Sequence, residues 1–73
     1  MGAPSSVTVD VRDMVCAQAL AVVAQALRRL QAGDAVEVLY NAQDVRRDLL
    51  VWAKDRGYPV LQVGEGALAI RRA

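Results

Sequence analysis

The sequence predicts an α/β (α+β) two-layer sandwich of order βαβαββ, with a four-stranded mixed sheet and two helices on one face. Three observations predict this fold: short segments alternate apolar and polar residues, two longer segments repeat apolar residues at helical spacing, and turn-forming residues separate them. The chain has 73 residues, 55% of them hydrophobic and 23% charged, which suits one small core. We therefore expect a single domain over residues 7–73, preceded by a flexible leader at 1–6.

The first strand and the first helix are predicted from the spacing of their apolar residues. A strand is expected at about 7–12, where three valines alternate with polar residues. The helix that follows has an inner stripe of Leu20, Val23, Leu27 and Leu30. Asp13 is the best candidate to cap its N-terminus, and Gly33 suits the left-handed position that ends a helix.

The second half repeats the pattern and then closes with a hairpin. A strand at 35–40 leads to a helix that Asn41 is expected to cap. That helix has an inner stripe of Val45, Leu49, Trp52 and Ala53, and Gly57 ends it. Strands at about 58–63 and 67–71 flank a glycine-rich turn. Because each helix is apolar on one side only, both should cover the same sheet face and leave the other face open.

Composition excludes several function classes. Nine basic and eight acidic residues leave a net charge of +1, so direct nucleic-acid binding is not expected. With no histidine and a single cysteine, the chain lacks Cys–His and Ser–His–Asp arrangements and the usual zinc ligands, and we expect no metal or other cofactor. The first six residues do not resemble a signal peptide and no segment approaches the ~20 apolar residues of a membrane span, which predicts a cytoplasmic protein. Nothing in the pattern supports a homo-oligomer.

The most informative residue is the single cysteine, Cys16, which lies where the first strand passes into the first helix. Unpaired N–H groups and the positive end of the dipole at a helix N-terminus favour a thiolate, as a nucleophilic cysteine requires. Position 16 also lies on the same side as Leu20, which suits a buried and inert cysteine. A nearby Asp13 would raise the pKa of the thiol. Both interpretations stay open at this point.

Several motifs together resemble the TusA/SirA-type sulfur carriers over roughly residues 7–72. These are the approach Val9-Asp10-Val11-Arg12-Asp13-Met14-Val15-Cys16, the helix end Leu27-x-x-Leu30-x-x-Gly33-Asp34, the pair Arg47-Asp48-Leu49 and Trp52-Ala53, Gly57, and the end Ile70-Arg71-Arg72. The family's Cys-Pro-x-Pro motif is degenerate here, as Cys16-Ala17-Gln18-Ala19. Ala42-Gln43 stand where the family has Asp-Pro, Asp13 replaces a glycine, and Ala24-Gln25 replace basic residues. Without the prolines, the first helix could begin earlier, capped by Asp13.

The resemblance implies a small sulfur carrier or sulfurtransferase that acts with partner enzymes. Cys16 would accept sulfane sulfur as a persulfide from a donor protein and pass it to an acceptor protein. Asp10 and Asp13 would support the cysteine loop, although Asp10 could equally be a solvated strand residue. Arg46, Arg47 and Asp48 could form a docking patch or an ordinary solvated helix face.

Two alternatives belong to other classes of protein. One is a non-catalytic protein-interaction module that keeps the fold and has lost sulfur transfer. The other is a small RNA-binding domain, which the near-zero charge and the few aromatic residues disfavour.

Overall fold

The computed structural model describes residues 6–72 and has the expected element order. Its elements are β1 (Ser6–Asp10), α1 (Cys16–Arg28), β2 (Ala35–Leu39), α2 (Gln43–Arg56), β3 (Val60–Gly64) and β4 (Ala67–Arg71). The predicted leader falls almost entirely on residues 1–5, which lie outside the described residues. No helix in the described part of the chain is long and apolar enough to cross a membrane.

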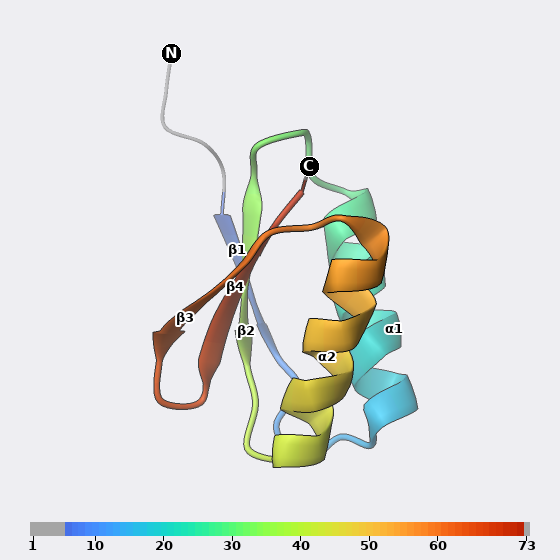
Figure 1. Cartoon of the computed structure of the whole chain (residues 1–73), viewed down its shortest axis with the longest axis vertical. Helices are drawn as coiled ribbons and strands as arrows, with labels where there is room; N and C mark the ends of the chain where they lie inside the picture. The colour runs from blue at the N-terminus through green and yellow to red at the C-terminus, as the bar shows by residue number, and fades with distance from the viewer. Residues whose placement is uncertain (1–5, 73) are drawn as a thin grey trace.

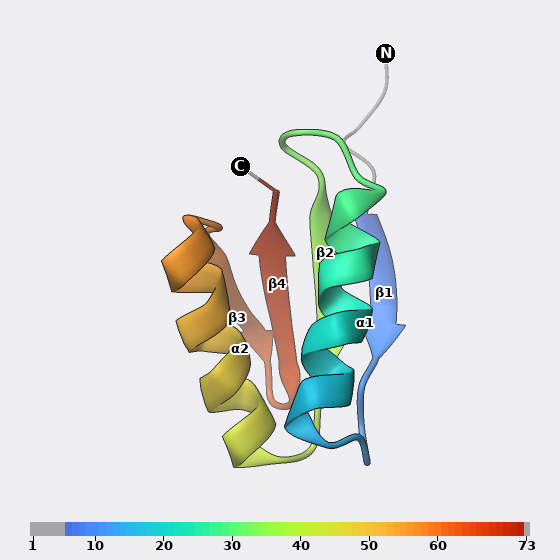
Figure 2. The ribbon, with the colours of Figure 1, turned by 90° about the vertical axis from the view of Figure 1, so that its right-hand side faces the viewer.

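The four strands form one mixed sheet in the order β1-β2-β4-β3. β1 and β2 are parallel, with α1 as the connection between them, while β4 pairs antiparallel with both β2 and β3. Both helices lie on one face of this sheet, next to each other and pointing the same way (Figures 1 and 2). The predicted fold class and the shared helix face are therefore confirmed.

The core lies between the sheet and the two helices. Its buried residues include Val36 and Val38 of β2, Leu68 and Ile70 of β4, Ala19, Val23 and Leu27 of α1, and Val45, Leu49 and Ala53 of α2. The inner stripes were thus placed correctly, with Leu20 and Trp52 only half-buried at their margins. Trp52 packs edge-on against Tyr58 with ring centroids 5.6 Å apart, and Arg56 lies 5.4 Å above its ring. Trp52 therefore covers the edge of the core.

The predicted helix N-caps are wrong at both helices. The N-cap residues are Val15 and Ala42, and neither side chain makes a capping hydrogen bond. Asp13 and Asn41 bond to each other instead, so neither is available to cap a helix. Val15 is extended, with φ −76° and ψ 160°, so α1 does not continue toward the N-terminus, and Asp13 lies in the preceding turn with φ 65°. The helix begins at Cys16 although the family's prolines are missing.

The C-terminal end of α1 also differs from the prediction. α1 ends at Arg28 with Arg29 as its C-cap in the right-handed conformation, so Gly33 is not the cap. Gly33, at φ 92°, lies in the turn before β2 and donates its N–H to the carbonyl of Arg72 at 2.8 Å. Nη1 of Arg72 lies 2.7 Å from the carbonyl oxygens of Leu27 and of Leu30. The C-terminus of the described chain is thereby joined to the end of α1.

The remaining boundaries agree with the predictions to within two residues. β1 ends at Asp10 because Arg12 and Asp13 form a turn, and β3 begins after Pro59. Gly57 ends α2 in the left-handed conformation as predicted, with φ 77°. Thr8, Asp10 and Glu37 are exposed, as expected for the open sheet face.

Candidate functional site

Cys16 is the first residue of α1, at the end of the molecule where both helices begin (Figure 2). The parallel strands β1 and β2 also end there, so their following loops come together. The cysteine is free and partly exposed, and Val15 beside it is 66% exposed. Cys16 thus packs partly against the core, at the start of a helix whose first N–H groups have no intrahelical acceptor.

Carboxylates of α2 raise the pKa of the Cys16 thiol. Hydrogen bonding to Asp48 raises the pKa of Cys16 above its ordinary value, and burial and the charges of Asp44 and Asp48 act in the same direction. A helix N-terminus favours a lowered thiol pKa, but the pKa of Cys16 is raised. The sequence predicts that Asp13 raises the pKa of the thiol, and this prediction is wrong. The carboxylates that raise it belong to the neighbouring helix, α2.

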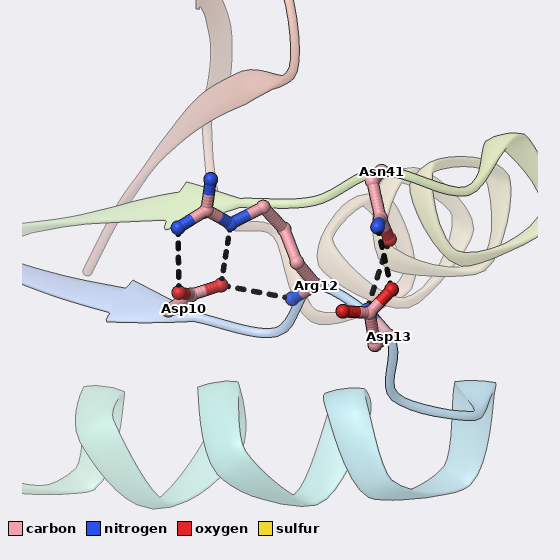
Figure 3. Close-up of polar contacts among 4 residues, drawn as sticks. All are labelled: Asp10, Arg12, Asp13 and Asn41. Carbon is pink, nitrogen blue, oxygen red and sulfur yellow. Dashed lines mark hydrogen bonds and ion pairs between the residues drawn. The ribbon is translucent and has the colours of Figure 1, made fainter.

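Asp10 fixes the turn that leads to the cysteine. Its Oδ1 accepts hydrogen bonds from the backbone N–H of Arg12 at 3.0 Å and from Nε of Arg12 at 2.9 Å, while Oδ2 accepts from Nη2 at 2.8 Å (Figure 3). Hydrogen bonds from the Arg12 side chain and then from its backbone lower the pKa of Asp10 to about 2. Asp10 thus stays ionised and shapes the loop, although it is exposed to solvent.

Asp13 and Asn41 join the loop before α1 to the loop before α2. The backbone N–H of Asp13 donates to Oδ1 of Asn41 at 2.9 Å, and Nδ2 of Asn41 donates to Oδ1 of Asp13 at 2.8 Å (Figure 3). Asp13 has a positive φ of 65°, which glycine adopts most readily and which Asp is among the residues to tolerate. The pair fixes the two helix starts relative to each other.

The predicted docking residues are turned to different sides of α2. Nε of Arg46 donates to Oε1 of Gln62 at 3.1 Å, which joins α2 to β3. Arg47 is exposed, and Asp48 is half-buried and raises the pKa of Cys16. Sequence reasoning missed Asn41 and Asp44 as members of the site. The spacing of Asp44 and Asp48, four residues apart at a helix start, was the available signal.

The chemistry available is that of one thiol with carboxylate neighbours. Among residues 6–72, no group of three or more His, Cys, Asp or Glu side chains could hold a metal ion. The described site therefore offers one partly buried thiol whose pKa is raised by carboxylates of α2.

The fold and the site define a class of protein. Its members are small two-layer α/β proteins with one cysteine at the junction of the first strand and the first helix. The family model for sulfurtransferase TusA matches residues 7–71, and the chain belongs to this family. The crystal structure of a SirA-like protein from Desulfitobacterium hafniense is similar, with a TM-score of 0.69 and 28% sequence identity over 88% of this chain and 90% of that one. No functionally curated protein matches the chain significantly.

Proposed function

We propose that this protein is a small sulfur carrier, which accepts sulfane sulfur as a persulfide on Cys16 and relays it between partner proteins. The observation that carries the proposal is the position of Cys16: a partly exposed cysteine opens α1 in a chain of the TusA family. The helix starts at this residue without the family's prolines, because Val15 before it is extended. The degenerate motif therefore keeps Cys16 at the start of α1.

The transfer step balances without an oxidant or reductant. The Cys16 thiol loses its proton, and its sulfur attacks the outer sulfur of a cysteine persulfide on the donor. The donor's S–S bond breaks as a new S–S bond forms on Cys16, and the donor cysteine leaves as a thiolate that takes up a proton. Relay to an acceptor thiol repeats the same exchange with Cys16 as the leaving sulfur.

Hydrogen bonding to Asp48 and burial raise the pKa of Cys16 above its ordinary value, so the thiol form dominates at neutral pH. A thiolate of higher pKa is intrinsically more nucleophilic, which offsets part of that loss. The carrier is thus slow to react alone and depends on its partner for activation.

Intact-mass spectrometry tests this function directly. The chain is incubated with a cysteine desulfurase and cysteine, and we expect a mass increase of one sulfur atom that dithiothreitol removes. Cys16→Ser should gain nothing. Absence of the adduct, while a known carrier in the same reaction is loaded, would refute sulfur carriage.

The raised thiol pKa also favours a second candidate function, a protein-interaction module without sulfur transfer. The two candidates differ in what Cys16→Ser does in the cell. A carrier loses its biological role with this change, whereas an interaction module keeps it.

A further inference from the structure

The sheet has two edge strands, β1 and β3, and they differ in how well they are protected from further pairing. β3 begins directly after Pro59, and its pairing with β4 shifts register between Gln62 and Gly64. Both features hinder the addition of another strand. β1 contains no proline and pairs with β2 in a regular register along its whole length. Its one charged residue, Asp10, lies at its end and is paired with Arg12. β1 is therefore the edge that can accept a strand.

The backbone of β1 presents hydrogen-bonding groups on its free side. The N–H of Val11, just after the strand, donates to the carbonyl oxygen of Leu39 at 2.8 Å, so the backbone groups of Val11 face β2. Successive residues of a strand turn these groups to opposite sides, so those of Val7 and Val9 also face β2 and those of Thr8 face outward. In an antiparallel pair, two directly opposite residues exchange both of their hydrogen bonds. The Thr8 backbone is free to form such a pair.

A groove of about 370 Å³ lies beside this free side, between β1 and α1. It is lined mainly by apolar residues of β1, of α1 and of the segment after α1, namely Val7, Val9, Val22, Ala26 and Leu30. Val7 is 40% exposed there, and α1 carries no charged residue before Arg28. We call the free side of β1 together with this groove the β1 edge. It is poor in charge, as the centres of protein interfaces are.

The two ends of the β1 edge differ in charge. α1 runs back along β1 (Figure 2), so Arg29 lies beside the start of β1, where it lines the groove with Val7. Beyond the other end of β1 lies the exposed carboxylate of Asp13, while Asp10 and Arg12 offset each other. A second copy in the antiparallel orientation reverses these ends. Arg29 of each copy then comes to the end of the other copy that holds Asp13, so the charges are complementary twice.

We propose that the β1 edge binds a second copy of this chain, with the two β1 strands antiparallel about a two-fold axis at Thr8. The pairing joins the two four-stranded sheets into one. Val7 of one copy lies opposite Val9 of the other on the groove side, and Thr8 lies opposite Thr8 on the open sheet face. Asp10 lies opposite Ser6, which keeps the two Asp10 carboxylates at opposite ends of the contact.

A second copy fits this edge for a reason that an unrelated extended peptide lacks. The alternation of Val7, Thr8 and Val9 is symmetric about its centre, so reversing the strand brings valine against valine and threonine against threonine. Aliphatic pairs and threonine pairs directly across two strands both stabilise a sheet. The proposal does not depend on sulfur carriage, because Cys16 is not among the residues that line the groove.

Sedimentation equilibrium of the intact chain over a series of concentrations tests the dimer. We expect a reversible monomer–dimer equilibrium that high salt weakens, since Arg29 and Asp13 attract each other across the contact. Val7→Lys places a charge in the contact and should weaken dimerisation roughly tenfold or more. The matched control is Val63→Lys, which changes the 47% exposed valine of the other edge strand and should dimerise as the parent does. A parent that is monomeric at every concentration, or equal effects of the two lysine substitutions, would overturn the proposal.

Disulfide formation tests the register independently of affinity. In a Cys16→Ser background, Thr8→Cys should form a disulfide between two copies on mild oxidation, because directly opposite residues have Cα atoms about 5.5 Å apart, within disulfide range. Glu37→Cys is the control: Glu37 is the neighbour of Thr8 on β2, one strand further from the axis, and should stay reduced. Equal crosslinking of both variants, or a dimer in which Thr8→Cys does not crosslink, would refute pairing through β1. Neither measurement involves sulfur transfer, so the dimer is tested separately from the proposed function.

Discussion

The two ends of the helical layer are built differently. At the end with Cys16, both helix N-caps lack side-chain hydrogen bonds, and the loops are held by exposed pairs such as Asp13 with Asn41. At the opposite end, Arg72 bonds to two carbonyl oxygens of the α1 terminus, and Gly57 closes α2 in the left-handed conformation. The helix carbonyl groups are thus satisfied at the second end, whereas the first end is held mainly by contacts between its loops.

The largest effect should come from the core that both ends share. Leu27 is 2% exposed, so Leu27→Ala should lower the free energy of unfolding by about 2–5 kcal/mol. Trp52→Ala should cost less than Leu27→Ala, because Trp52 is only half-buried at the edge. Urea denaturation followed by circular dichroism measures both, and equal costs would show that Trp52 belongs to the core proper.

The stability of the end opposite Cys16 should depend on Arg72. Arg72→Ala removes two charge-assisted hydrogen bonds to the α1 carbonyls and should cost about 1–3 kcal/mol in the free energy of unfolding. Arg71→Ala, the neighbouring exposed arginine, is the control and should change stability little. Equal effects of the two substitutions would contradict the capping role.

A substitution at the end that holds Cys16 should lower the free energy of unfolding less, and it should also change the reactivity of Cys16. Asn41→Ala should cost roughly 0.5–1.5 kcal/mol, because the two bonds to Asp13 are exposed. It should also change the pH dependence of Cys16 alkylation, because it frees the loop before α1 from the loop before α2. A lower stability with an unchanged alkylation profile would mean that the pair only stabilises the fold.

The smallest effect on stability should be that of Asp10 at acidic pH. The pKa of Asp10 is lowered to about 2 in the folded chain, so its contribution is present above the unfolded pKa of ~3.9 and is lost as pH falls toward 2. Asp10→Asn should therefore reduce the loss of stability over that interval and alter little at neutral pH. Acid titration of unfolding for both proteins measures this difference, and parallel curves would contradict it.

Local patterns account for what could be predicted. The strands, the inner stripes and Gly57 follow from residues within one element, and the order of elements followed from them. Asp13 and Asn41 are good caps by local rules, yet they are 28 residues apart and pair with each other. Arg72 meets α1 across more than 40 residues. The thiol's carboxylates likewise come from another helix, so only the packing of the layers could reveal them.

The attachment of Arg72 has a practical consequence for handling the protein. β4 runs away from the end where α1 begins, so the last described residue lies at the far end of the molecule from Cys16 (Figure 1). A dye, resin or fused domain attached beyond the C-terminus would leave the end of the molecule that holds Cys16 free. Surface immobilisation through that end is therefore the geometry in which exchange partners can be flowed over the thiol and their binding recorded.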